Sequence, residues 1–222
     1  MKKHLTFLKL DETSLNEEIK KNTPLIVVRN FFPKKTCKDI IKFCLSHSSI
    51  DNHRIKKFNK FFNLFTLDVL PGNVAINRIF RRFEFNRNTF NKFVDIKKLL
   101  SLHNKIIKKS PKKGEKRTGN NKRVAVMHYP KGGGFFDWHQ HDRYPTNYAA
   151  IVTLTKKGVD FKVGGANFQI GKNRIDLEKY NISIGDLLLF RYDLKHSISK
   201  VDPRENLLFD NSGRWSLVMF LD

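Results

Sequence analysis

The chain has 222 residues, of which 40% are hydrophobic, and a formal net charge of +22. This length suits one sizeable domain with its own core, and the hydrophobic content excludes a chain that is disordered throughout. The charge favours a polyanionic or anionic partner, but we interpret most of it as solvated basic surface.

The sequence predicts a cytoplasmic protein. No segment approaches the roughly 18 consecutive apolar residues of a membrane span, and the first residues lead into a mixed polar stretch rather than an apolar signal region. Cys37 and Cys44 are the only two cysteines, and they lie about two turns apart if their segment is helical. We therefore expect buried thiols rather than a disulfide.

The first half of the chain predicts one strand followed by supporting helices. Residues 24–32 are rich in β-branched residues and predict a strand, and a helical pattern opens at 33–36. Residues 73–85 and 88–109 carry apolar residues at helical spacing, so we expect both segments to be helical. Such helices would cover one face of a sheet.

A basic segment separates the two halves. Residues 104–123 hold nine Lys and Arg against a single acid, Glu115, among Gly, Ser, Pro and Asn. This composition predicts a mobile loop. It could act as a lid or clamp for an anionic substrate, although we favour a solvated connection.

From residue 123 onward, short apolar runs alternate with turn residues, which predicts a β domain. There is no internal repeat, and about eight such runs suit a barrel or a two-sheet jelly roll. We expect a single domain over 1–222, with the strand and helices in 1–109 and the β core in 123–222. The runs expected to form strands cover 123–130, 135–142, 148–155, 165–170, 185–193, 195–201 and 214–222.

Three histidines in this half form a candidate metal site. His139 and His141 would project from the same face of a strand, with Cβ atoms about 6 to 7 Å apart, so they could share one metal ion. His196 follows an apolar strand and would be the third ligand if the β fold returns it to the pair. Three imidazoles, or two with a carboxylate, leave positions open for iron chemistry with oxygen, although they would also suit zinc. Asp142 or Asp137 is the alternative carboxylate ligand.

The C-terminal half resembles the iron(II)/2-oxoglutarate-dependent dioxygenase superfamily, especially its phytanoyl-hydroxylase-like and prolyl-hydroxylase-like branches. The resemblance covers 123–222, and the superfamily usually has Asp or Glu where His141 stands. It implies a mainly β, α+β fold, a double-stranded β-helix of the jelly-roll or cupin type braced by N-terminal helices. Four motifs of the superfamily are matched in order. A Tyr-x-x-Gly turn stands at 129–132, and the Trp-His-x-Asp strand end is matched at 138–141 with His in place of Asp. A Gly-Asp-led apolar strand follows at 185–190, and an Arg-x-Ser pair at 214–216.

The resemblance also implies a function. Fe(II), 2-oxoglutarate and O2 would hydroxylate an unactivated C–H bond and release succinate and CO2, with no catalytic side chain beyond the metal centre. Arg214 would receive the distal carboxylate of 2-oxoglutarate through two parallel hydrogen bonds, and Ser216 and Tyr129 would add further ones. The apolar residues after Ser216 indicate a buried strand, in which an arginine needs an anion.

The substrate class and two rival functions stay open. The charge favours a small anionic or nucleotide-linked substrate, and no membrane partner is expected. One rival is a three-histidine cupin-like dioxygenase that needs no 2-oxoglutarate, against which Arg214 and Ser216 argue. The other is a basic nucleic-acid-binding module that uses residues 104–123, but no standard nucleic-acid motif appears.

Overall fold

The computed structural model describes residues 4–46, 65–70, 74–85, 92–109, 122–140, 148–208 and 210–221. The helices of these residues are α1 (Glu12–Lys20), α2 (Lys34–Ser46), α4 (Val94–Lys109) and the short 3-10 helix η3 (Leu177–Tyr180). The strands are β1 (Leu5–Leu8), β2 (Leu25–Val28), β3 (Phe65–Leu70), β4 (Val74–Phe85), β5 (Lys122–Tyr129), β6 (Gly134–His139), β7 (Tyr148–Thr153), β8 (Gly165–Ile170), β9 (Asn173–Asp176), β10 (Leu187–Arg191), β11 (Lys195–Val201) and β12 (Arg214–Leu221).

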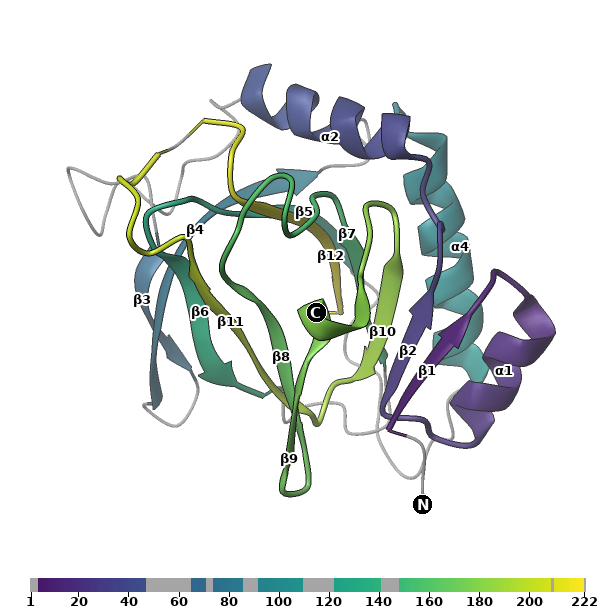
Figure 1. The fold of residues 1–222 in the computed structure, drawn as a ribbon. Helices are drawn as coiled ribbons and strands as arrows, with labels where there is room; N and C mark the ends of the chain where they lie inside the picture. Colours follow the sequence, from purple (N-terminus) through teal and green to yellow (C-terminus); the bar gives the residue numbers. More distant parts are fainter. Residues whose placement is uncertain are drawn as a thin grey trace.

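These strands form one strongly curled sheet, whose order is β1-β2-β10-β7-β12-β5-β4-β6-β11-β8-β9, with β3 beside β4. The long strand β4 pairs with β5 on one side and with β6 on the other, so it joins the two halves of the sheet. The halves face each other around a shared interior (Figure 1). This arrangement is the predicted jelly-roll double-stranded β-helix, and the fold prediction is confirmed.

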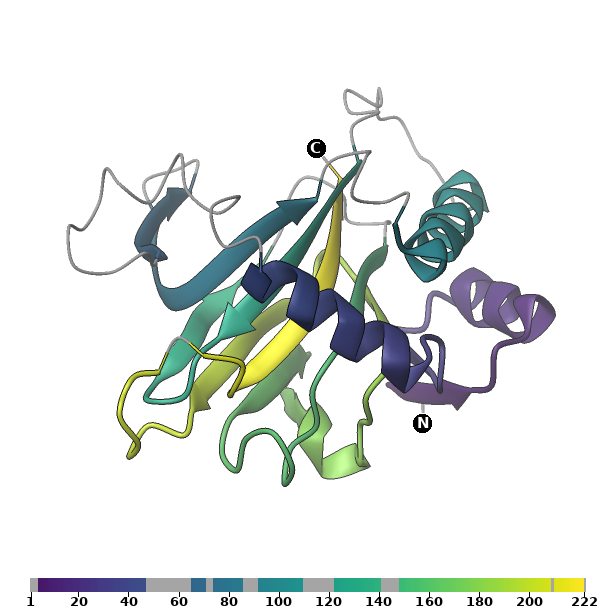
Figure 2. The ribbon, with the colours of Figure 1, turned by 90° about the horizontal axis from the view of Figure 1, so that it is seen from above.

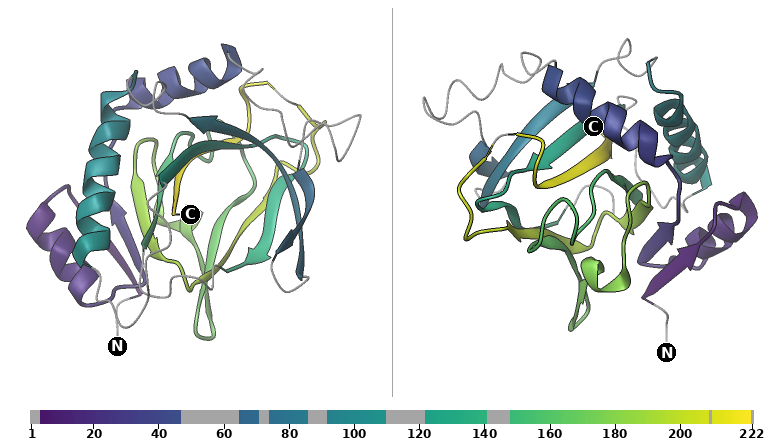
Figure 3. Two further views of the ribbon diagram at one scale, coloured as in Figure 1. Left: turned by 180° about the vertical axis from the view of Figure 1, so that it is seen from behind. Right: turned by 45° about the horizontal axis from the view of Figure 1, so that its top comes forward.

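The helices cover the outer face of the larger half-sheet. Figures 2 and 3 show α1, α2 and α4 around the outside of the curled strands, with none in the interior. Strand β12 alternates accordingly, since Trp215, Leu217 and Met219 belong to the core cluster that includes residues of all three helices. Arg214 and Ser216 therefore face the interior between the half-sheets.

Much of the predicted element order is confirmed. Strand β2 and helix α2 lie where the sequence predicts them, and all seven runs predicted as strands after residue 122 contain a strand. Both cysteines are buried in α2 as free thiols, and burial raises the pKa of Cys37 to about 12. In the part of the chain that the structure describes, no helix is long and apolar enough to span a membrane.

The helix predicted over 73–85 is wrong, because this segment is β4. Phe83 and Phe85 pack toward the helices, whereas Phe80 packs into the interior, so both faces of the strand are buried. A strand covered on both faces lacks the apolar and polar alternation of a half-exposed strand. Arginines interspersed among the phenylalanines then produced an apparent helical period.

The predicted basic loop is also partly wrong. Residues 104–109 form the last turns of α4, whose helical pattern continues further than the change in composition indicates. Residues 122 and 123 already belong to β5. The rest of the predicted loop, 110–121, lies outside the described residues.

Candidate functional site

Two of the three predicted metal ligands lie side by side in the interior. His139 ends β6 and His196 is the second residue of β11, and the two residues are direct partners across these antiparallel strands. Their ring centroids are 4.1 Å apart, and both side chains are buried. Residues 57 positions apart in the sequence thus present two imidazoles to one point.

A β-bulge in β6 sets the direction of His139. His196 pairs with His139 and Ile198 pairs with Phe136, so three residues of β6 span the same length as two residues of β11. The extra residue places Phe136 and His139 on the same face, although a regular strand would put them on opposite faces. Their rings stack with centroids 3.9 Å apart.

The backbone fixes both imidazoles in the same way. His139 Nδ1 lies 2.8 Å from the carbonyl oxygen of Asp137, and His196 Nδ1 lies 2.8 Å from that of Leu194. A carbonyl oxygen can only accept, so each Nδ1 donates its hydrogen, and the lone pair of the neutral ring lies on Nε2. Metal-binding histidines are commonly oriented by such a hydrogen bond.

Two candidates for the third ligand, His141 and Asp142, lie outside the described residues, and strand β6 ends at His139. Asp137 is exposed, and its carboxylate accepts a hydrogen bond from the Trp138 backbone N–H. Among the described residues, no group of three potential metal ligands occurs.

Aromatic rings surround the histidine pair. Phe168 stacks on His196 at 5.8 Å between ring centroids, and Phe190 meets the same ring edge-on at 4.8 Å. Phe136 covers His139 from the other side. This apolar wall limits the access of water and strengthens electrostatic interactions at the pair.

The predicted anion-binding residues also face the interior. Arg214 and Ser216 are almost completely buried, and among the described residues Arg214 Nε and Ser216 Oγ have no hydrogen-bond partner. Tyr129 is the cross-strand partner of Arg214. Burial raises the pKa of Tyr129 to about 12, while nearby Arg214 and Arg78 oppose that rise, so the phenol stays protonated.

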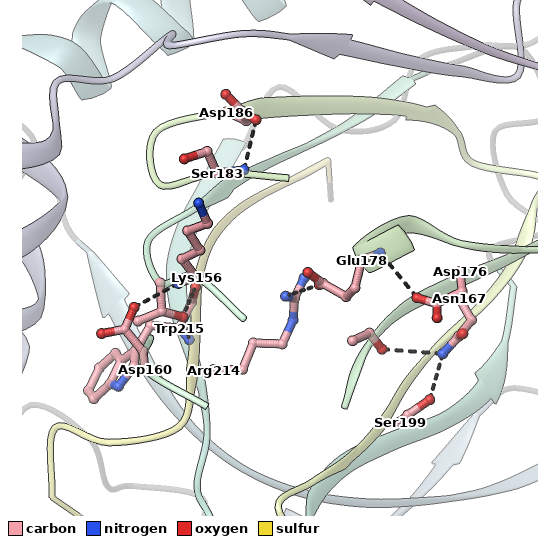
Figure 4. Close-up of polar contacts among 12 residues, drawn as sticks. Lys156, Asp160, Asn167, Asp176, Glu178, Ser183, Asp186, Ser199, Arg214 and Trp215 are labelled. Carbon is pink, nitrogen blue, oxygen red and sulfur yellow. Dashed lines mark hydrogen bonds and ion pairs between the residues drawn. The ribbon is translucent and has the colours of Figure 1, made fainter. Parts of the chain in front are cut away.

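The anion beside Arg214 comes from this chain. Arg214 Nη1 donates to Glu178 Oε1 of η3 at 2.7 Å, and the two side chains are 4% and 3% exposed (Figure 4). Glu178 was not among the site residues predicted from the sequence. Glu178 lies 36 residues before Arg214 in the short helix η3, and no local sequence pattern indicates which arginine it pairs with.

Another buried histidine has a structural role. His128 lies on the outer face of β5, where it accepts a hydrogen bond from Arg81 Nε at 3.0 Å and donates from Nε2 to the Ser212 carbonyl at 2.7 Å. Its ring stacks on Trp215 with centroids 4.0 Å apart. Burial, reinforced by the charge of Arg81, lowers the pKa of His128 to about 3.

The fold has counterparts among solved structures. A prolyl-4-hydroxylase from Pseudomonas putida superposes with a TM-score of 0.58 at 12% identity, covering 93% of this chain and 97% of its own. A prolyl hydroxylase from Trichoplax adhaerens, in complex with a hypoxia inducible factor oxygen degradation domain peptide fragment, gives 0.60 at 14% identity, covering 96% and 93%. This chain has the prolyl hydroxylase fold.

The likeness to prolyl hydroxylases is one of structure and not of sequence. No protein-family model matches the sequence, and no curated protein matches it either. Both alignments cover more than nine-tenths of this chain, so the likeness extends well beyond the C-terminal half.

Proposed function

We propose that the protein is an Fe(II)- and 2-oxoglutarate-dependent oxygenase that hydroxylates a C–H bond of a small anionic substrate. The observation that carries this proposal is the pairing of His139 and His196 across β6 and β11, with both Nδ1 atoms anchored to backbone carbonyls. The prolyl hydroxylase fold and the resemblance of the C-terminal half to the 2-oxoglutarate oxygenases support the same assignment.

The donor set fits a divalent transition metal. His139 and His196 would bind through Nε2, and a third ligand would come from His141 or Asp142. Two or three imidazoles suit iron and leave coordination positions open. The bound iron, with 2-oxoglutarate and O2, supplies the oxidising power to functionalise a C–H bond, with succinate and CO2 as products.

The interior also has donors for a carboxylate. Arg214 Nε and Ser216 Oγ are buried polar atoms without a partner among the described residues, and such atoms are costly unless a ligand or water satisfies them. They lie on the same face of β12, two residues apart, so one carboxylate could accept from both. Tyr129, the cross-strand partner of Arg214, is the third proposed donor.

An anionic substrate is supported by Arg78 on the inner face of β4. Its guanidinium carbon lies 5.4 Å from the ring centroid of Phe136, which itself stacks on His139. A cation at this position could hold a phosphate or carboxylate group of a substrate next to the metal centre.

Turnover without substrate tests the proposal. Purified protein loaded with Fe(II) in air should convert 2-oxoglutarate to succinate slowly, and His196→Ala should abolish the conversion. Failure of the metal-loaded protein to bind 2-oxoglutarate in calorimetry would remove the co-substrate from the proposal.

The pairing of Arg214 with Glu178 favours a second candidate. Because the buried arginine already has an anion, it does not by itself require 2-oxoglutarate. The second candidate is therefore a cupin-like oxygenase that binds its substrate directly to the metal. Iron binding without 2-oxoglutarate binding would support it.

A further inference from the structure

The cavity beside Arg214 is nearly filled. It is lined by side chains that include Thr153, Ala166, Leu177 and Glu178, and only about 10 Å³ of it is open to the centre of a water molecule. That is about the space that one water needs. A five-carbon dicarboxylate cannot enter while the Glu178 side chain holds its present position.

The position of Glu178 is built into the fold. A Cβ at Gly165 would come within 2.2 Å of Glu178 Cγ, so the glycine makes room for the glutamate side chain. The Glu178 backbone N–H donates to the Asp176 carboxylate at the start of η3. At the C-terminal end of η3, Arg29 donates to the carbonyl oxygens of Tyr180 and Asn181, so both ends of the turn are held.

The negative charge of Glu178 also disfavours a second carboxylate at Arg214, as the volume of its side chain does. Arg214 is neutralised by Glu178 in a buried pair, and a second carboxylate placed beside Glu178 would meet a like charge in a poorly screened interior. A carboxylate ligand therefore gains the full attraction of Arg214 only when Glu178 is absent.

We propose that Glu178 is an internal competitor for the anion site of Arg214, so that a dicarboxylate binds Arg214 only after Glu178 leaves it. The proposal rests on the proposed function in one respect, namely that the ligand is 2-oxoglutarate. Glu178 then sets the affinity for the co-substrate, because part of the binding free energy is used to displace it.

Glu178→Gln tests the competition directly. The amide removes the competing charge at nearly the same side-chain volume. Calorimetry with Mn²⁺ in place of iron should therefore show that 2-oxoglutarate binds to this variant at least about tenfold more tightly than it binds to the unmodified protein. Glu205→Gln, the same change at an exposed carboxylate, should bind as the unmodified protein does. Equal or weaker binding by Glu178→Gln would overturn the proposal.

Two further variants keep the test decisive. Glu178→Asp retains the charge but shortens the reach to Arg214, so it should also bind more tightly, and it carries the test if Glu178→Gln does not fold. Adding Arg214→Met to Glu178→Gln should abolish the gain, because the site of competition is then lost. A gain that survives Arg214→Met contradicts the proposal.

Glutarate separates this proposal from the proposed function. It carries both carboxylates but lacks the keto group that chelates metal, so metal-free Glu178→Gln should bind it and should gain more thermal stability from it than the unmodified protein does. If glutarate and 2-oxoglutarate bind equally with and without Mn²⁺, the oxygenase assignment fails but the competition stands. If Glu178→Gln binds neither dicarboxylate, the competition is refuted.

Discussion

His139 and His196 are direct partners across β6 and β11, and each donates its Nδ1 hydrogen to the carbonyl two residues before it. The backbone of two neighbouring chain segments thus orients both rings in the same way. A metal site built in this way has its ligand directions fixed before the metal arrives.

We expect His139→Ala and His196→Ala each to lose iron, because each removes one of two converging imidazoles. Iron per chain after loading and desalting should fall close to zero, while far-ultraviolet circular dichroism stays unchanged. His4→Ala, which alters a histidine outside this site, should keep its iron. Full iron retention by both site variants would exclude this metal centre.

The third ligand can be identified by comparing three alanine variants. Asp137→Ala should keep iron, because the Asp137 carboxylate is exposed and only its backbone carbonyl holds His139. The sequence favours His141 as the ligand, so His141→Ala should lose iron and Asp142→Ala should retain it. The opposite result for the last two would establish a histidine and carboxylate set.

Breaking the Arg214 and Glu178 pair should destabilise the protein. Arg214→Met leaves a carboxylate buried without its cation, which typically costs about 3 to 5 kcal/mol in the free energy of unfolding. Adding Glu178→Gln should recover part of this loss, because no charge then remains buried. Urea unfolding measures both values, and exposed Arg204→Ala should change the free energy by less than about 0.5 kcal/mol.

Acid should destabilise the fold through His128. Its pKa is about 3 when folded and about 6.5 when unfolded, so between these values the unfolded chain binds a proton that the folded chain excludes. The contribution of His128 to the free energy of unfolding is therefore fully present above about pH 6.5. It falls as the pH drops, by up to about 1.4 kcal/mol per pH unit. Urea unfolding at several pH values should show a shallower slope for His128→Gln, and an unchanged slope would assign the effect to other groups.

Seven of the strands after residue 122 could be predicted from the sequence because each is a short run with apolar residues between turn residues, whereas β9, with the sequence NRID, carries no such signal and was not predicted. The chemical types at the site were also predictable, since histidine and arginine in buried strands need partners. Two features were not. The bulge before His139 is one extra residue in an otherwise ordinary strand, and the pairing of Glu178 with Arg214 depends on how β8 and η3 fold across the interior.

The bulge in β6 has a consequence for chain length. If one residue were deleted at Asp137 or Trp138, β6 could pair regularly with β11, and His139 would still oppose His196 on the inner face, because Phe136 and His139 would then be two positions apart. At its present length a regular β6 would turn the imidazole of His139 toward the outside of the barrel, although every ligand would still be present in the sequence. In this fold, the match between the number of residues in β6 and the presence of the bulge determines whether the two imidazoles converge, as much as the identity of the ligands does.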